Sequence, residues 1–236
     1  MSKLKILIAD DDIGVQKLLT RVLEDKDYET VTASNGLSAQ MKAEKESPDL
    51  VILDMKIPKV EGLEVCKSLR EWSQVPILML SADSSIDTKI KCLEAGADDY
   101  VCKPFNIEEV STRIFVLLRR SQNQMEAAES VVSAADIVID FRARTVTKAG
   151  KEVKLTRTEF ALLNELVINV GKILSHIDLL KKVWGKEYSD ETEYLRVFIN
   201  RLRAKLETNP ANPRYIITTS GFGYMFNESK PDQVTE

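Results

Sequence analysis

The chain has 236 residues, of which 44% are apolar and 30% are charged, and its formal net charge is −4. This length allows one large domain or two of ordinary size, with the composition of a globular protein. No apolar run approaches the roughly 20 residues of a membrane helix, and charges interrupt the first apolar stretch too early for a signal peptide. We therefore expect a cytoplasmic protein with no membrane partner. Because neither half of the chain is basic overall, any nucleic-acid binding must come from a local cluster.

The cysteines and the single histidine argue against several kinds of site. Cys66, Cys92 and Cys102 are odd in number and have no CxxC spacing, which indicates free thiols in a reducing compartment. His176 is the only histidine, which excludes a histidine metal cage and argues against a Ser-His-Asp triad. It also makes the chain a poor candidate for a histidine phosphodonor.

The first half of the chain alternates two hydrophobic periods. Short apolar runs occur at residues 4–9, 29–33, 50–55, 76–81 and 99–104. Between them, apolar residues recur at helical spacing, for example Val15, Leu18, Leu19, Val22 and Leu23. Five strands alternating with five helices predict an α/β fold with a doubly wound, five-stranded parallel sheet of flavodoxin-like type.

Polar residues collect at the carboxyl ends of these predicted strands. Asp10, Asp11 and Asp12 follow the first strand, Asp54 nearly ends the third, Ser81 ends the fourth, and Lys103 follows the fifth. In an open α/β sheet such residues meet at one edge, near the point where the strand order reverses. A hard cation such as Mg²⁺ would offset the repulsion between the carboxylates, and Ser81 and Lys103 could hold a phosphoryl group carried by Asp54. Asp12 taken alone fits a helix cap equally well.

The pattern changes after residue 120. Residues 121–133 are mostly polar or small and predict a linker, or else a frayed continuation of the fifth helix. Residues 136–156 predict short antiparallel strands with a turn at Ala149–Gly150. Three helices follow, one from Thr158, one from a Ser175 cap to Gly185, and a long one at about 192–207, before a β-hairpin that turns at 221–223. We expect domains at 1–120 and 134–229 and a tail at 230–236.

The motifs of the first half resemble the receiver domain of bacterial two-component response regulators. The resemblance covers the first 120 residues and rests on "ILIADDD", "PDLVILDMKIP", "GLEVCKSLR", "PILMLSA" and "GADDYVCKPF". It implies that a partner sensor histidine kinase phosphorylates Asp54, and that Ser81 and Tyr100 reorient together as a switch. The Mg²⁺ ligands it implies are Asp10 through water, Asp11, Asp54 and the backbone carbonyl of Lys56. It further implies a cis peptide bond between Lys103 and Pro104.

A phosphatase or phosphotransferase with an Asp nucleophile on a similar sheet is the alternative of another class. Haloacid-dehalogenase-like enzymes of this kind usually place a second Asp two residues after the first, where this chain has Lys56. The lysine side chain cannot ligate metal or act as a general acid in the same way. We therefore expect that the chain is not an enzyme.

The helix expected at 192–207 carries a polar stripe opposite an apolar one. Arg196, Asn200 and Arg203 recur at intervals of four and three residues, with Arg201 nearby. Arg and Asn suit bidentate contacts with guanine and adenine edges, although a stripe of this kind taken alone fits a solvated face better. Trp184 and Phe160 lie at helical spacing, which favours core packing over base stacking.

The second half resembles the winged helix-turn-helix effector of the OmpR/PhoB family. The match runs from about residue 136 to 226 through "LTRTEFALLNEL", "LLKKVWG", "LRVFINRLRAKLE" and "YIITTSGFGYMF", and its spacing looks most similar to potassium-transport regulators. It implies a recognition helix in the major groove of promoter DNA and a wing over the minor groove. The expected DNA contacts are Arg196, Asn200, Arg201 and Arg203. Many relatives carry wing arginines where this chain has Ser220 and Met225.

The family resemblance also implies a homodimer of the phosphorylated chain. Its face would contain Ile90, Leu93 and Val110, with Lys89–Glu109 and Asp99–Arg113 bridging the two subunits, although ordinary surface pairs would look the same in sequence. We predict a DNA-binding transcription regulator that dimerises when Asp54 is phosphorylated and that has RNA polymerase as a further partner. The alternative is a regulator that works without phosphate and uses the receiver only to dimerise. The intact carboxylate set argues against it.

Overall fold

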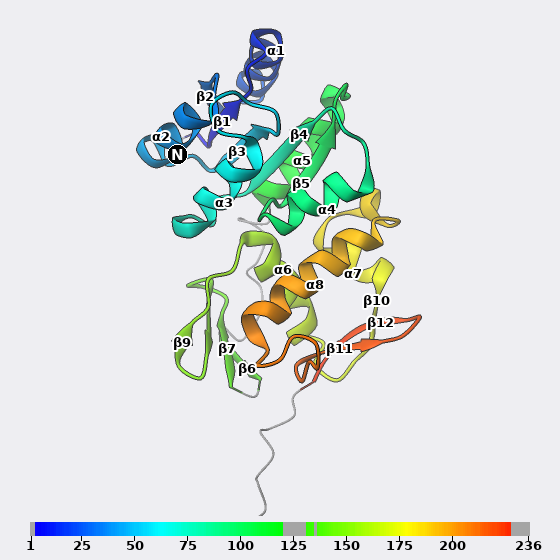
Figure 1. Ribbon diagram of the computed structural model, residues 1–236. Helices are drawn as coiled ribbons and strands as arrows, with labels where there is room; N and C mark the ends of the chain where they lie inside the picture. The colour runs from blue at the N-terminus through cyan, green and yellow to red at the C-terminus, as the bar shows by residue number, and fades with distance from the viewer. Residues whose placement is uncertain (1–2, 120–130, 135, 228–236) are drawn as a thin grey trace, which may run out of the picture. The chain divides into compact units, whose positions relative to one another are not determined.

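The chain forms two compact units, Met1–Ser121 and Gln122–Glu236, in a computed structural model that describes residues 3–119, 131–134 and 136–227 (Figure 1). None of the helices in these three stretches is both long and apolar enough to cross a membrane. The predicted linker at 121–133 lies mostly outside the described residues, and so does the tail at 230–236. The linker prediction runs too far at its end, because strand β6 begins at Val131.

The first unit is a five-stranded parallel sheet in the order β2-β1-β3-β4-β5, which confirms the predicted doubly wound fold. Its elements are β1 (Lys5–Ala9), α1 (Ile13–Glu24), β2 (Glu29–Ala33), α2 (Gly36–Glu46), β3 (Leu50–Asp54), α3 (Gly62–Trp72), β4 (Ile77–Ser81), α4 (Ile86–Glu94), β5 (Asp99–Cys102) and α5 (Ile107–Arg119). The strand order reverses between β1 and β3. The carboxyl ends of these two strands therefore frame the crevice in which such sheets bind ligands.

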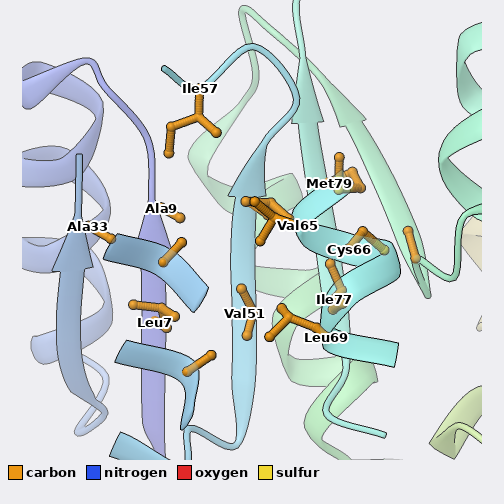
Figure 2. Packing of buried hydrophobic residues seen from close by; sticks show 14 of the residues in the cluster. Leu7, Ala9, Ala33, Val51, Ile57, Val65, Cys66, Leu69, Ile77 and Met79 are labelled. Atoms are coloured by element: carbon orange, nitrogen blue, oxygen red, sulfur yellow. The ribbon is translucent and has the colours of Figure 1, made fainter. Parts of the chain in front are cut away.

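Two apolar layers hold the helices against the two faces of this sheet. One layer joins alternate strand residues, such as Leu7, Val51 and Ile77, to the apolar stripe of α3 (Figure 2). The other layer joins the intervening strand residues, such as Ile6 and Ile52, to α1 and α5. Every residue of β3 and β4 is buried. Strands covered on both faces are apolar throughout, which is why these segments read as continuous apolar runs.

In its described residues, the second unit combines two small antiparallel sheets with three helices. Its elements are β6 (Val131–Ala134), β7 (Ile137–Asp140), β8 (Thr145–Lys148), β9 (Lys151–Glu152), α6 (Arg157–Val167), β10 (Leu174–Ser175), α7 (His176–Val183), the 3₁₀ turn η1 (Lys186–Tyr188), α8 (Thr192–Leu206), β11 (Ile216–Thr219) and β12 (Gly223–Phe226). This helix-turn-helix followed by a hairpin is the winged helix expected from the sequence. Trp184 is fully buried and Phe160 is 9% exposed, which confirms that both are core residues.

Two local features of the second unit differ from the prediction. Helix α6 begins at Arg157, one residue earlier than expected, because the Thr156 hydroxyl and the Glu159 carboxylate form a reciprocal capping box. Strand β10 was missed because it has only two residues, and its pairing with β12 is antiparallel. The hairpin at Ala149–Gly150 is confirmed, with both residues at positive φ.

A buried carboxylate fixes the connection from α8 to β11. The carboxylate of Glu207, which is 7% exposed, accepts hydrogen bonds from the backbone N–H groups of Arg214, Tyr215 and Ile216, each at 2.9 Å. The residues between Glu207 and Arg214 therefore form a closed loop. The Glu207 side chain therefore ties the start of β11 to the end of α8.

We expect Glu207→Ala to lower the free energy of unfolding of the second unit by about 3 kcal/mol, because three backbone donors lose their acceptor. Glu207→Gln retains one acceptor oxygen and should lose less. Urea unfolding followed by tryptophan fluorescence measures this loss. The chains also carry Trp72→Phe, so that Trp184 in the second unit is their only tryptophan. Exposed Glu152→Ala is the control, and an equal loss in Glu152→Ala and Glu207→Ala would contradict the prediction.

Candidate functional site

The carboxyl edge of the parallel sheet holds one ammonium group between two carboxylates. Nζ of Lys103 lies 2.6 Å from Oδ2 of Asp10 and 3.1 Å from Oδ1 of Asp54. Asp10 is fully buried and Asp54 is 5% exposed. These residues follow or end β1, β3 and β5, so the parallel sheet brings together side chains that are far apart in sequence.

Three carboxylates at this edge fit a divalent cation. Asp10, Asp11 and Asp54 each offer an oxygen, and these oxygens lie within 4.8 Å of one another. Carboxylate oxygens are the donors that Mg²⁺ prefers, so these three side chains fit such a cation. Asp12 has a different role, because it caps α1 by accepting hydrogen bonds from the N–H groups of Gly14 and Val15.

Burial and charge act in opposite directions on this pair. Burial raises the pKa of Asp54 above its usual range, although the Lys103 ammonium opposes the shift. For Lys103, burial acts to lower the pKa, but the hydrogen bond to Asp10 and the charges of both carboxylates outweigh it and raise the pKa. The site therefore keeps a firmly charged ammonium next to a carboxylate whose ionised form is poorly solvated.

The backbone after β3 comes close to Asp54. A Cβ on Gly62, the first residue of α3, would collide with the carbonyl oxygen of Asp54, so only glycine allows the helix to start there. Lys56 lies in the turn between them, where its side chain is exposed. The peptide bond between Lys103 and Pro104 is cis, as the family resemblance implied.

Ser81 and Tyr100 meet at one residue that the sequence did not single out, Asp83. Oγ of Ser81 accepts a hydrogen bond from the Asp83 N–H at 3.1 Å, and the Tyr100 hydroxyl donates to the Asp83 carbonyl oxygen. The Asp83 carboxylate accepts hydrogen bonds from the Thr88 hydroxyl and the Ser85 N–H, which lower its pKa to about 2. An Asp followed by serines before a helix is a turn signal that would have found this loop.

The predicted recognition helix, α8, presents only part of its predicted stripe to solvent. Arg196 and Asn200 are exposed, and 65% of the Arg196 side chain is accessible. Arg196 also pairs with Glu193 one turn earlier, at 2.9 Å. These two residues lie four positions apart and so share one face of the helix.

Arg201 and Arg203, the other two predicted DNA contacts, are half-buried and are held by contacts within the unit. Arg201 forms a 2.7 Å ion pair with fully buried Glu159 of α6, and its side chain is only 13% exposed. Arg203 donates to the carbonyl oxygen of Ile216 and to the Thr218 hydroxyl at the base of the β11–β12 hairpin. Both guanidinium groups are bound within the unit, so they hold α8 in place.

Comparisons with known proteins agree with both halves of the structure. Residues 6–115 match the model of the response regulator receiver domain, and residues 150–226 match that of the transcriptional regulatory protein C-terminal domain. The KDP operon regulator KdpE of Escherichia coli is 41% identical over 224 residues, covering 94% of this chain and 98% of that protein. The chain belongs to the OmpR/PhoB family of response regulators. Its two domains imply a histidine kinase partner and DNA binding, and make it a two-component transcriptional regulator.

Other relatives of this response regulator are equally similar. KdpE of Mycobacterium tuberculosis H37Rv is 39% identical over 94% of this chain and 98% of that protein, and the probable regulator ycf27 of Cyanophora paradoxa is 40% identical over 97% and 98%. Among solved structures, a mutant of RitR covers 96% of this chain with 25% identity and a TM-score of 0.78. DrrB of Thermotoga maritima, an OmpR/PhoB homologue, is 31% identical over 95% of this chain with a TM-score of 0.52.

Two residues of the predicted dimer face of the receiver are core residues, which is a further correction. Leu93 is 1% exposed and Val110 is fully buried, because both pack inward under their helices. Lys89 and Ile90 are half-buried. The large apolar side chains that α4 and α5 do expose are Ile86 and Phe115, at 60% and 55%.

Three charged residues of this face, Asp99, Glu109 and Arg113, form ion pairs within one chain. Arg113 contacts both Asp99 and Glu109, at 3.0 and 2.8 Å. An intermolecular bridge from Asp99 to Arg113 would therefore have to replace an existing contact. Asp99 itself is 1% exposed.

We expect Asp54→Asn to raise the melting temperature of the metal-free chain at neutral pH. The pKa of Asp54 is raised on folding, so ionisation of this carboxyl opposes folding and stability falls as the pH rises through the raised pKa. Thermal unfolding in chelator measures the effect, which should vanish below the ordinary carboxyl pKa of 3.8, where both states are protonated. Exposed Glu44→Gln is the control. An unchanged or lower melting temperature in Asp54→Asn would contradict the expectation.

Proposed function

We propose that Asp54 is the phosphoacceptor of this response regulator and that its phosphorylation, with Mg²⁺ bound, controls DNA binding. The observation that supports this most directly is the Lys103 ammonium, 2.6 Å from Asp10 and 3.1 Å from Asp54 at the carboxyl edge of the sheet. An acceptor carboxylate beside a fixed cation suits phosphoryl transfer, in which catalysis is mainly positioning and charge stabilisation.

The reaction forms an aspartyl phosphate. A carboxylate oxygen of Asp54 bonds to phosphorus while the P–N bond of the kinase phosphohistidine breaks, and the imidazole nitrogen keeps the electron pair. The carboxylates of Asp10, Asp11 and Asp54 and the carbonyl of Lys56 would hold Mg²⁺, whose charge neutralises the phosphoryl oxygens. Lys103 would donate to one of these oxygens, and the Ser81 hydroxyl to another.

The Ser81–Asp83–Tyr100 contacts support the proposed switch. If Ser81 turns to the phosphoryl group, its hydrogen bond from the Asp83 N–H is lost, and the Tyr100 hydroxyl that bonds the same residue loses a fixed partner. This change would shift the equilibrium between two conformations of the α4–β5–α5 face, which contains Lys89, Ile90 and Glu109.

Phosphorylated chains would then pair through this face and place two α8 helices on neighbouring half-sites of promoter DNA. The two binding events combine through effective concentration, without new base contacts. We place this regulator in the cytoplasm, where it would act on transcription beside RNA polymerase.

Intact mass after incubation with Mg²⁺ and acetyl phosphate tests the acceptor. We expect one phosphoryl group on the native chain and none on Asp54→Asn, because the acceptor oxygen is gone. Asp11→Asn retains the acceptor but loses a metal ligand, so its mass gain should require more Mg²⁺. Asp12→Asn, which alters only the cap of α1, is the matched control.

The outcome decides between phosphate-dependent and phosphate-independent regulation. Equal phosphorylation of native and Asp54→Asn chains would place the acceptor elsewhere. A native chain that gains no mass but still binds DNA as a dimer would favour the regulator that uses its receiver only to dimerise.

Fluorescence anisotropy tests the role of α8 in DNA binding. The DNA is a duplex that the phosphorylated native chain selects from a random-sequence pool. We expect Arg196→Ala and Asn200→Ala each to weaken binding by about 1–3 kcal/mol, the usual worth of a bidentate base contact. Lys151→Ala, at an exposed cation of β9, should change affinity little. Normal affinity in both α8 variants would show that another surface reads the DNA.

A further inference from the structure

The tip of the β11–β12 hairpin exposes a phenylalanine. Phe222 is 70% exposed, more than any other large apolar side chain in the described part of the chain. Its neighbours along the hairpin differ, since Ile216, Tyr224 and Phe226 are buried. The hairpin thus packs its apolar residues at its base and leaves one aromatic ring in solvent. Figure 1 shows the hairpin extending away from the helices of its unit.

The turn that carries this ring is fixed on both sides. Strand residues Thr219 and Gly223 are paired, and the Phe222 N–H donates to the Thr219 carbonyl oxygen at 3.0 Å. Gly221 has a φ of +75°, a conformation that glycine adopts without strain. A Cβ on Gly223 would collide with the carbonyl oxygen of Leu174, so β10 anchors the outgoing strand. Phe222 is therefore held at the end of a braced hairpin.

The hairpin carries no charged side chain. Residues 215–226, "YIITTSGFGYMF", contain no Lys, Arg, Asp or Glu. The cation at its base, Arg203, is bonded to Ile216 and Thr218. A wing of this composition has no arginine at its tip to place in a minor groove, and the large side chain exposed at its tip is Phe222.

We propose that Phe222 is a DNA-contacting residue that inserts its ring into the minor groove beside the site read by α8. The inference rests on the proposed function, because it takes DNA as the ligand of this domain. Apolar side chains of this type enter the minor groove of architectural complexes and partly unstack base steps. The free energy of such a contact depends on how easily the DNA deforms. Flexible pyrimidine–purine steps are therefore favoured at the position under the wing.

The proposed contact has an electrostatic signature that separates it from a phosphate contact. A phenyl ring releases no counterions, whereas each Lys or Arg on a phosphate adds to the salt dependence of binding. Replacing Phe222 should therefore lower affinity equally at low and high salt. Replacing a cation that contacts a phosphate would instead reduce the salt dependence.

The experiment uses the full phosphorylated chain and the duplex selected from a random-sequence pool by the native protein. We expect Phe222→Ala to weaken binding about tenfold with an unchanged salt slope, the loss of one well-buried contact. Phe222→Trp, which keeps a ring, should restore affinity. Ile168→Ala, at an exposed apolar residue on the end of α6, is the matched control and should bind as the native chain does. Hydroxyl-radical footprints of Phe222→Ala should lose only the minor-groove protection flanking the half-site.

Two results would overturn the proposal, and they are distinguishable. If the native chain retains no duplex from the pool, the proposed function and this contact both fail. If the native chain binds but Phe222→Ala binds equally well with an unchanged footprint, only the contact fails. Reduced self-association of Phe222→Ala in ultracentrifugation, with unaltered DNA binding, would assign the ring to a protein contact instead.

Discussion

The Lys103 ammonium is the interaction on which the chemistry of this regulator depends. Two carboxylates, one of them fully buried, would repel each other at the sheet edge, and one cation within 3.1 Å of both makes their approach tolerable. Lys103, which carries this cation, directly follows β5, the strand at one edge of the sheet. Neighbouring residues fix the backbone that carries these carboxylates. Gly62 lets α3 start against the carbonyl oxygen of Asp54, and the Gln16 side chain donates to the Asp10 carbonyl oxygen.

In the second domain, buried carboxylates hold the elements of the fold together. Glu159 accepts the Thr156 N–H and pairs with Arg201 and Lys205 of α8, so every ligand of this carboxylate is supplied by the domain itself. Glu207 accepts hydrogen bonds from three backbone donors. These groups fix α8 and the hairpin as a rigid pair. The receiver carboxylates Asp10, Asp11 and Asp54 differ because together they fit a divalent cation, and burial makes the ionisation of Asp54 unfavourable.

This contrast explains how one chain combines a switch with a rigid reader. In the receiver, Ser81 and Tyr100 share Asp83 through hydrogen bonds that a phosphoryl group could redistribute. In the second domain the exposed groups, Arg196, Asn200 and Phe222, stand on elements braced by buried contacts. Under the proposed function, phosphorylation would change how two readers are brought together and would leave each reader's own structure intact.

The sequence by itself determined the architecture and the gathering of polar side chains at one edge of the parallel sheet. Both follow from local signals, namely apolar strand runs, helical spacing and polar residues at strand ends, and parallel strands bring those ends to one edge. Only the tertiary structure decided how individual side chains are used. Arg201 and Arg203 look like Arg196 in sequence, yet packing turns them to Glu159 and to the hairpin. Leu93 and Val110 proved to be core for the same reason, since helical spacing gives a residue's face but not what covers it. The folded chain likewise decided the exposure of Phe222 and the hydrogen bonds that join Asp83 to Ser81 and Tyr100.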